Sequence, residues 1–346
     1  MMGAARAVLA AAVLAATPVI GQPTPTFTIL SFDDLNGWQD DDQQAALGVF
    51  RKTCKSLRGA EWASVCALSS GNFNARTFFE LFFRPILIED GTPALFTGYF
   101  EPELNGSLQR TARFRYPLYR KPPEMPDNRL WFTRSEIETS GMLSGRGLEI
   151  AWIDDPVDVF YLQVQGSGRV RLSDGTTLRV GFGGSNGHSY QSIGKELVRQ
   201  GVYQASQVSA QVIRNWVRRN PVRGQALLRT NPSYVFFRRV RGVTPDQGPL
   251  GAMNASITTD RTLAVDRKFV PLGAPVWVEK GGQRSFARLM VAQDTGSAIK
   301  GAQRGDIFFG TGDAAGKAAG RVRDPGRMVV LMPIEMAYAR ADGLGE

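Results

Sequence analysis

The sequence predicts a mainly β protein with a few helices, in which a middle β-rich unit is inserted into a main domain. Three observations lead to this prediction. The chain has 346 residues, enough for one large or two medium domains with a real core. Short runs of β-branched and aromatic residues alternate with glycine-containing turns in the middle and in the last quarter. The first hundred residues contain about one predicted strand, which would have to pair with strands from the C-terminal part.

Helices are expected to dominate the N-terminal part. The predicted elements are, in order, helices at 41–57 and 75–83, an extended segment at 92–100, a short strand at 116–119 and a short helix beginning at Thr133. Pro85 would end the second helix. The sequence Thr133-Arg-Ser-Glu136 fits a capping box, in which the two side chains satisfy backbone N–H groups at the start of a helix.

The middle and the end of the chain carry most of the predicted strands. In the middle, strands are expected at 157–165, 169–172 and 177–180, followed by helices at 192–200 and 209–219, the second ended by Pro221. Later strands are expected at 234–239, 276–279, 287–292, 307–309 and 328–332. The predicted division is a main domain of 22–104 and 238–346, with its aspartate-rich part at about 250–335, and an inserted domain of 105–237.

The N-terminus is typical of a secretory signal. Arg6 is the only charge in the first 27 residues, and an apolar stretch runs from Ala7 to Ile20. We expect a signal peptide at 1–21, with an uncleaved N-terminal helix as the alternative. No cysteine lies near the cleavage point, so no lipid anchor is expected. In an oxidising compartment Cys54 and Cys66 are either a disulfide or two buried thiols, and the spacing leaves both open.

The composition of the chain argues against several kinds of active site. The chain has one histidine, His188, and two cysteines, which argues against a zinc centre and a Ser-His-Asp triad. We expect neither metal nor cofactor. The formal net charge of +9 favours an anionic polymer or surface as partner. Nucleic acid is the general expectation for such a charge, but an exported protein rarely meets it. His188 is interpreted as a hydrogen-bonded structural residue.

Three aspartates in the last quarter are the candidate catalytic groups. Asp266, Asp294 and Asp306 each adjoin a short apolar run and a glycine or proline, as expected for acids at strand ends. Glycosidic bond cleavage fits such carboxylates, because a carboxylic acid with a raised pKa can protonate the leaving oxygen. The apolar run 307–309 beside Asp306 would raise that pKa by desolvation. The alternative is that these residues only cap their own turns.

Two short motifs have weaker interpretations. The run Asp294-Thr-Gly-Ser297 matches aspartic proteases, but a two-lobed protease needs a second such motif, and the chain has none. The run Gly310-Thr-Gly-Asp-Ala-Ala315 resembles a dinucleotide fingerprint, but about thirty residues remain after it, too few for the βαβ unit. It is better interpreted as a loop that opens a short helix.

Longer motifs resemble one known family. In order from Thr97 to Pro333, the segments TGYFEPELNGS, VFYLQVQGSGRVRLSDG, GFGGSNGHSYQSIGKEL, NPSYVFFR, AVDRKFVPLGAPVWVE and AQDTGSAIKGAQRGDIFFGTG resemble the membrane-bound lytic murein transglycosylase A family, with its C-terminal three-aspartate domain. The resemblance implies a double-psi β-barrel main domain and a smaller inserted β-barrel, with a groove between them.

The resemblance also implies a reaction, in which the MurNAc-β-1,4-GlcNAc bond of peptidoglycan is cleaved without water to give 1,6-anhydromuramic ends. Asp306 is implied as the catalytic acid and base, Asp294 as its catalytic neighbour and Asp266 as a supporting residue. The implied substrate-binding residues are Thr97, Gly98, Tyr99, Glu101, Gln165 and Lys300. The segment 303–305 before Asp306 is expected to be a loop. The alternatives are a non-catalytic glycan-binding protein and a hydrolytic muramidase.

The expected setting follows from the predicted signal peptide and from one departure from the family, whose members are usually outer-membrane lipoproteins, whereas this chain lacks the lipid-attachment cysteine. The chain would be a periplasmic monomer, soluble or peripherally associated with the outer membrane, and it would act on peptidoglycan glycan strands. A cell-wall synthesis or remodelling complex is a further expected partner.

Overall fold

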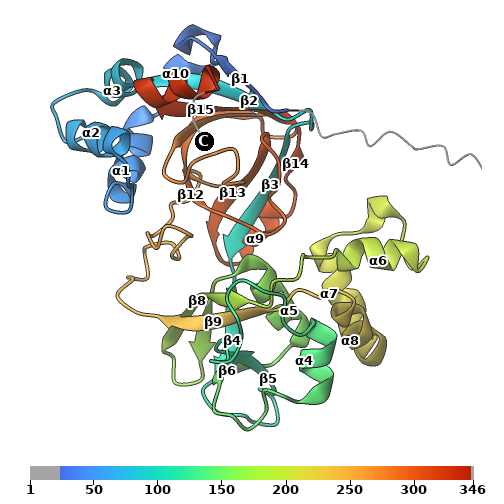
Figure 1. The fold of residues 1–346 in the computed structure, drawn as a ribbon. Coiled ribbons are helices and arrows are strands. Elements are labelled where there is room, and N and C mark those ends of the chain that lie inside the picture. Colours follow the sequence, from blue (N-terminus) through green and yellow to red (C-terminus); the bar gives the residue numbers. More distant parts are fainter. Residues whose placement is uncertain (1–23, 344–346) are drawn as a thin grey trace, which may run out of the picture.

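The computed structural model of the protein describes residues 24–343, so the predicted signal peptide lies outside the described residues. The strands form two sheets, a nine-stranded sheet A and a six-stranded sheet B. Figure 1 shows them as two units, one above the other, with the N-terminal and C-terminal segments together in the upper one. Strands from both ends of the chain thus share one sheet, as the insertion hypothesis required.

Sheet A draws its strands from both sides of the middle segment. In spatial order they are β1 (Thr26–Ile29), β2 (Phe83–Glu89), β15 (Gly326–Pro333), β11 (Pro275–Lys280), β12 (Phe286–Asp294), β10 (Thr262–Val265), β13 (Arg304–Thr311), β3 (Leu95–Glu101) and β14 (Arg323–Asp324). The expectation of about one strand in the first hundred residues is wrong, since β1, β2 and β3 all lie there. The segment 303–305 is also only partly a loop, because Arg304 begins β13.

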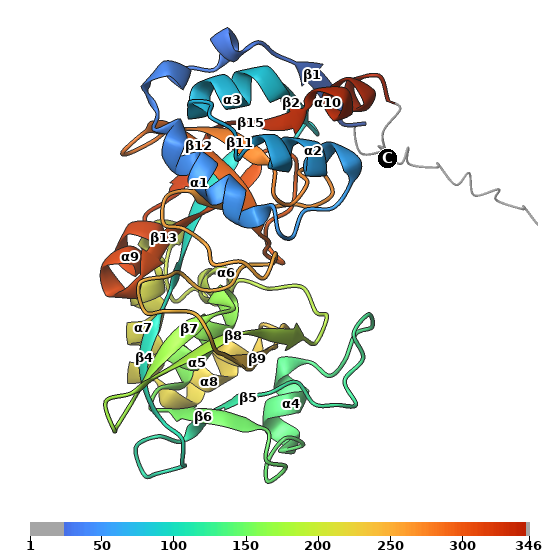
Figure 2. The same cartoon turned by 90° about the vertical axis from the view of Figure 1, so that its left-hand side faces the viewer.

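Sheet B lies in the middle of the chain. Its spatial order is β5 (Tyr116–Tyr119), β6 (Glu149–Ile153), β4 (Glu103–Ser107), β7 (Gly168–Leu172), β8 (Thr177–Ser185) and β9 (Val235–Val240). Figure 2 shows the chain passing from sheet A into sheet B along β3 and β4. It returns through the loop that separates β9 from β10. The two units are therefore joined by two chain crossings.

Helices are attached to both units. The upper unit carries α1 (Gln43–Thr53), α2 (Ala60–Leu68), α3 (Ala75–Phe82), α9 (Gly312–Ala319), α10 (Ile334–Ala341) and the short 3-10 helices Phe32–Asp34 and Trp38–Asp40. The lower unit carries α4 (Arg134–Ser140), α5 (Pro156–Gln165), α6 (Ile193–Arg199), α7 (Ala210–Arg219), α8 (Pro221–Arg229) and the 3-10 helix Ala205–Gln207. In the part of the chain described, no helix is both long and apolar enough to cross a membrane.

The strand expected at 157–165 is wrong, because this segment is helix α5. The Asp155 carboxylate accepts a hydrogen bond from the backbone N–H of Val157, and Pro156 occupies the first turn. The helix contributes Val157 and Phe160 to one hydrophobic cluster and Val159 and Leu162 to another. Since it is apolar on opposite sides, its sequence lacks the helical periodicity that a one-sided helix shows.

Pro221 does more than end α7. It is also the first residue of α8, where its missing N–H costs no hydrogen bond. The capping box predicted at Thr133 is confirmed: the hydroxyl of Thr133 accepts from the N–H of Glu136, and the Glu136 carboxylate accepts from the N–H of Thr133.

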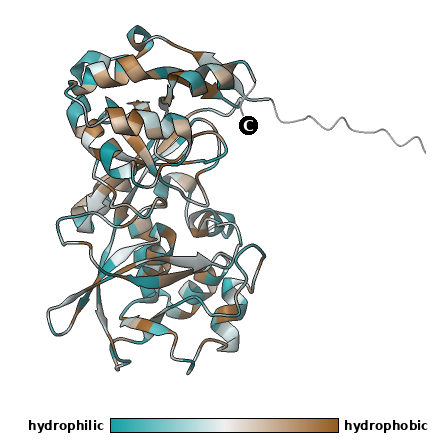
Figure 3. Cartoon of the chain, turned by 60° about the vertical axis from the view of Figure 1, so that its left-hand side comes forward, coloured by the Kyte–Doolittle hydropathy of each residue, from teal (hydrophilic) through white to brown (hydrophobic). Residues whose placement is uncertain are grey.

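The largest core lies between the strands of sheet A and helices α1 to α3. It includes the fully buried aromatic residues Phe50, Phe79 and Trp277. A disulfide joins Cys54 at the end of α1 to Cys66 on α2, which decides the question that the spacing left open. In Figure 3 hydrophobic residues colour the strands and much of the helices of the upper unit. The core therefore forms a fixed support for the strand ends described next.

Candidate active site

Asp306 lies on β13, and its neighbour on β3 is Thr97. The two strands pair in parallel, with Asp306 opposite Thr97 and Phe308 opposite Tyr99. The hydroxyl Oγ1 of Thr97 donates a hydrogen bond of 2.5 Å to Oδ1 of Asp306. These residues are 209 positions apart in the chain. Strand pairing alone brings them together.

Burial controls the protonation of Asp306. Desolvation of the partly buried carboxyl group raises its pKa from 3.8 to about 6. The Thr97 hydrogen bond and the positive charge of Arg304 favour the carboxylate and limit this rise, whereas the negative charge of Asp294 adds to it. A carboxyl group with this pKa can both give and take a proton near neutral pH.

Asp294 ends β12 and lies two strands away from Asp306. Strand β10 runs between β12 and β13, and its Ala264 pairs with both aspartates. Oδ1 of Asp294 accepts from the N–H groups of Ala252 and Thr295 at 3.0 and 2.9 Å. Burial raises the pKa of Asp294, and the hydrogen bonds that it accepts oppose the shift.

Tyr99 reaches Asp294 from the side of β3. Its hydroxyl donates to Oδ2 of Asp294 at 2.9 Å, and its ring packs on Phe308 at a centroid distance of 5.2 Å. Burial, and next the charge of Asp294, raise the pKa of Tyr99 well above its usual value, so it stays protonated and donates. Strand β3 thus supplies one hydroxyl group to each carboxylate.

Gly98, between Thr97 and Tyr99, is required by close packing. A Cβ at this position would lie 2.7 Å from Cα of Ala319 on α9 and 2.7 Å from a ring carbon of Phe309. Any side chain would therefore push β3 away from α9. The contacts of Gly98 indicate a role in packing the strand that carries the two hydroxyl groups.

Asp266 holds the loop between β12 and β13. Its Oδ2 accepts from the N–H of Gly301 at 3.0 Å, and the neighbouring N–H of Ala302 donates to Asp90 at 2.9 Å. Asp266 is 8% exposed. This hydrogen bond lies three residues before the start of β13, the strand that carries Asp306.

Glu101 lies at the junction of the two units and is fully buried. Its Oε2 accepts from Nε of Arg169 at 2.8 Å, from Nη2 of Arg179 at 3.1 Å and from Oγ1 of Thr311 at 2.8 Å. Both arginines come from sheet B and also donate to the carbonyl oxygen of Gln247 on the returning loop. Glu101 therefore joins the two chain crossings.

Two further residues implied by the resemblance differ in their surroundings. Oε1 of Gln165, the last residue of α5, accepts from the N–H of Phe100 at 3.0 Å and so anchors β3 to the lower unit. Lys300 is exposed in the loop between β12 and β13. His188 bonds through Nε2 to the carbonyl oxygen of Trp131 at 2.8 Å, as its structural interpretation requires.

Sequence reasoning missed Arg304, which stands two residues before Asp306. Its Nη2 donates to Oγ1 of Thr97 at 2.7 Å. Residues two apart on a strand share a face, so the strand position of Arg304 would have pointed to this contact. The sequence was interpreted instead as a loop there.

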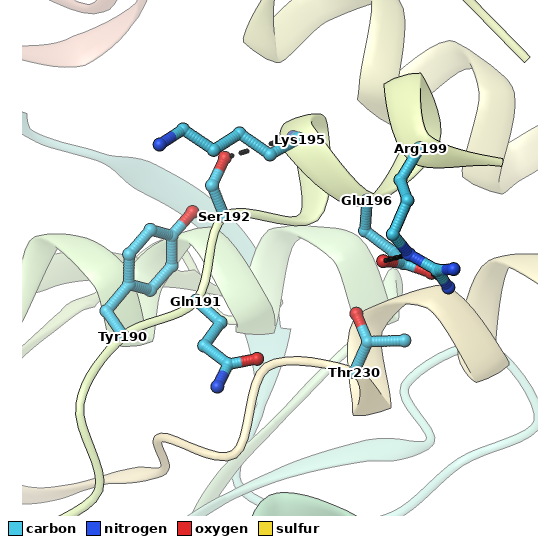
Figure 4. Close-up of a pocket in the computed structure, with 7 residues that line it drawn as sticks. All are labelled: Tyr190, Gln191, Ser192, Lys195, Glu196, Arg199 and Thr230. Atoms are coloured by element: carbon cyan, nitrogen blue, oxygen red, sulfur yellow. Dashed lines mark hydrogen bonds and ion pairs between the residues drawn. The ribbon is translucent and has the colours of Figure 1, made fainter. Parts of the chain in front are cut away.

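A cavity of about 480 Å³ lies away from these residues, in the lower unit. It is lined by Tyr190, Gln191, Ser192, Lys195, Glu196, Arg199 and Thr230 (Figure 4). The carboxylate of Glu196 pairs with the guanidinium of Arg199 at 2.6 Å, so these charges largely neutralise each other. The cavity contains none of the implied site residues. Within residues 24–343, no group of His, Cys, Asp and Glu has the arrangement of a metal site.

Comparison with known families gives two matches. The MltA specific insert domain matches residues 95–238, and the 3D domain matches residues 261–332. The first match covers sheet B together with β3, and the second contains all three aspartates.

Curated relatives are similar over the same region. The membrane-bound lytic murein transglycosylase A of Vibrio cholerae is 35% identical over 244 residues, which cover 68% of this chain and 64% of the relative. The enzyme of the same name from Escherichia coli K12 is 37% identical over 246 residues, covering 68% and 65%. The chain spans just under two thirds of the length of these curated relatives.

Solved structures match over more of their length. A membrane-bound lytic murein transglycosylase from Agrobacterium tumefaciens has a TM-score of 0.80 and 33% identity, with 91% of this chain and 99% of that one covered. MltA from Neisseria gonorrhoeae has a TM-score of 0.77 and 32% identity, covering 89% and 93%. MltA from E. coli with bound chitohexaose has a TM-score of 0.68 and 28% identity, covering 91% and 96%. The predicted fold class is thereby confirmed.

Proposed function

Because this chain belongs to the membrane-bound lytic murein transglycosylase A family, we propose that it is a lytic transglycosylase of peptidoglycan. It would cleave the β-1,4 bond between N-acetylmuramic acid and N-acetylglucosamine and leave a 1,6-anhydromuramic end. The proposal depends above all on Asp306, whose carboxyl group accepts a hydrogen bond from Thr97 and has a pKa raised to about 6.

The first step requires a protonated carboxyl group. With a pKa of about 6, roughly 9% of Asp306 is protonated at pH 7, compared with about 0.06% for a carboxyl group of pKa 3.8. Burial thus increases the population of the acid on the order of 100-fold. The proton passes to the glycosidic oxygen, the C1–O bond breaks, and positive charge develops at C1 of the muramic residue.

The second step reverses the role of Asp306. Its carboxylate takes the proton of the C6 hydroxyl of the same sugar, and O6 forms the new bond to C1. One carboxyl group gives one proton and takes one back, so the enzyme returns to its starting state and no water is consumed. A single residue can serve both steps because its pKa lies near the working pH.

The neighbouring residues have supporting roles in this proposal. Asp294, which accepts a hydrogen bond from Tyr99, is a second carboxylate near Asp306 at the same end of the strands of sheet A. There it can stabilise the positive charge at C1. Asp266 holds the loop before β13. Thr97, Gly98, Tyr99 and Lys300 are proposed to border the sugar chain, whereas Glu101 and Gln165 act through the position of β3.

We propose that the glycan strand lies in a groove between the two units, as the resemblance to the family implies. Binding of a glycan strand is supported by the structure of MltA from E. coli, which contains bound chitohexaose. We further propose that the inserted domain comprises residues 105–237, that the protein acts as a monomer, and that it works in the periplasm, soluble or at the outer membrane.

Product analysis tests the function. The purified protein is incubated with murein sacculi, and the released fragments are examined by mass spectrometry. Anhydromuramic ends support the proposal. Reducing ends alone would establish a hydrolase, and no release a binding protein, and either result contradicts it. The matched control is Asp33→Asn, which changes an exposed aspartate of the same unit and should leave the products unchanged.

A further inference from the structure

Arg304 touches the catalytic centre through a single hydroxyl group. Its Nη2 lies 2.7 Å from Oγ1 of Thr97, and the same oxygen lies 2.5 Å from Oδ1 of Asp306. The three groups form a chain from guanidinium to hydroxyl to carboxyl. The Thr97 hydroxyl is the middle link: it can accept from the guanidinium group of Arg304 and donate to the carboxyl group of Asp306.

We propose that Arg304 is a positioning residue that sets the direction of the hydrogen bond between Thr97 and Asp306, and thereby the carboxyl oxygen that carries the catalytic proton. The structural part of this proposal stands on geometry alone. Its consequence for turnover rests on the proposed function.

The direction follows from the chemistry of the three groups. A guanidinium group has donors and no acceptor, so Oγ1 of Thr97 must accept from Arg304. The hydroxyl proton then points elsewhere, and among the described residues the other hydrogen-bond partner of this oxygen is Oδ1 of Asp306. Arg304 occupies one of the two lone pairs of Oγ1, and Oδ1 of Asp306 is the acceptor within reach of the hydroxyl proton among the described residues, so donation from Thr97 to Oδ1 is the arrangement that satisfies all three groups.

This direction selects one oxygen of Asp306 for the proton. Oδ1 is occupied as an acceptor, and within residues 24–343 it is the oxygen through which the side chain of Asp306 makes its hydrogen bond. The acidic proton accordingly resides on Oδ2, which can face the glycosidic oxygen. If Thr97 could instead accept from Asp306, the proton would be shared between the two oxygens, and part of the population would point it away from the substrate.

The guanidinium group is held in place by backbone atoms. Its Nη1 donates to the carbonyl oxygens of Leu95 at 3.1 Å and Gly305 at 2.6 Å. Leu95 is the register partner of Arg304 on β3, as Thr97 is of Asp306. The planar guanidinium group thus contacts both strands, with Nη1 on the two carbonyl oxygens and Nη2 on Thr97.

Other charged groups lie near these three hydrogen-bonded residues, and the experiment must distinguish their effect on Asp306 from that of Arg304. Asp294 on β12 acts on Asp306, and Arg323 on β14 acts on Arg304. Tyr99 on β3 senses Asp306 as well. Arg323 pairs with Thr97 in the sheet register but is exposed, which makes it a matched control for the loss of a nearby positive charge.

The test is a double-mutant cycle on the titration of Asp306. The protein is labelled with ¹³C at the aspartate carboxyl carbons, and Asp306→Asn identifies the signal. The variants are Arg304→Met, Thr97→Val and the double variant, with Arg323→Met as control. If Arg304→Met does not fold, Arg304→Gln replaces it, since an amide can donate and accept.

We expect Arg304→Met to raise the pKa of Asp306 in the parent chain and to have a clearly smaller effect when Thr97 is already valine. Arg323→Met should shift the titration less than Arg304→Met. Equal shifts with and without the Thr97 hydroxyl would mean that Arg304 acts only through space, and would overturn the proposal. An equal shift for Arg323→Met would do the same.

Turnover of sacculi supplies the second readout. We expect kcat to fall roughly 10- to 100-fold in Arg304→Met, because the proton of Asp306 no longer points at the substrate. KM should change little, because Arg304 does not bind the substrate. Arg304→Lys, which keeps a donor-only cation, should recover most of the loss. If the parent protein forms no anhydro ends, the proposed function is refuted. The titration cycle tests the hydrogen bonds between Arg304, Thr97 and Asp306 independently of that result.

Discussion

Replacing Asp306 by asparagine should abolish turnover and at the same time stabilise the fold. Asparagine keeps the shape of the side chain and an oxygen that can accept from Thr97, but it has no acidic proton. Burial raises the pKa of Asp306 from 3.8 to about 6, which means that the folded chain holds a carboxylate less readily than the unfolded chain does. A neutral amide removes this penalty.

The size of the effect follows from the two pKa values. Between pH 3.8 and pH 6 the folded chain keeps a proton that the unfolded chain has released, so stability falls as the pH rises through this window. The full penalty, about 3 kcal/mol, is present above pH 6. Asp306→Asn should therefore gain about 3 kcal/mol at pH 8 and almost nothing at pH 3.5.

Urea unfolding followed by tryptophan fluorescence measures this gain. Trp38, Trp62 and Trp277 are buried in the core of the upper unit, and the other three tryptophans lie in the lower unit, so the signal follows the unfolding of both units. The midpoint at pH 8 should increase by about 1 M or more, with Asp33→Asn as the exposed control. A variant that is less stable than the parent at pH 8, or a gain that does not depend on pH, would refute the reasoning.

Three further predictions concern pH, the disulfide and the junction. The cleavage rate of sacculi should fall about 50-fold between pH 6 and pH 8, because the acid form of Asp306 is lost above a pKa of about 6; a flat profile would assign the proton to another group. Replacing Cys54 and Cys66 by serine should cost about 3 kcal/mol in urea unfolding, since the loop they close separates them by 12 positions, and a loss well below 1 kcal/mol would contradict this. Glu101→Gln should cost roughly 3 kcal/mol or more in the same assay, because it leaves the buried Arg179 and the half-buried Arg169 without their carboxylate; an unchanged midpoint would show that the ion pairs do not hold the junction.

Local signals in the sequence predicted several elements well. The capping box of Thr133 and Glu136 lies within four consecutive residues, so it can be predicted from local sequence. The strands at 276–279 and 328–332 could be predicted from their runs of apolar residues. The failures share a physical cause. Helix α5 is buried on opposite sides, so its apolar residues have no single face. The residues at 157–165 are also rich in valine and aromatic side chains, which favoured a strand.

The candidate site was predictable to a different degree for each residue. Asp306 could be singled out because it follows a glycine and precedes three apolar residues within a long family motif. Glu101 was implied as a substrate residue, whereas in the structure its carboxylate meets two arginines and a threonine. Those arginines come from sheet B, and their approach depends on how the two units meet.

The sequence by itself determined the candidate acid, the mainly β class and the interruption of the main domain by a middle segment. Only the tertiary structure decided the protonation of that acid and the identity of the groups around it. Thr97 and Arg304 belong to strands whose parallel pairing joins residues more than 200 positions apart. A strand carries its alternation of faces in its own residues, but its partner and register arise from packing across the whole sheet.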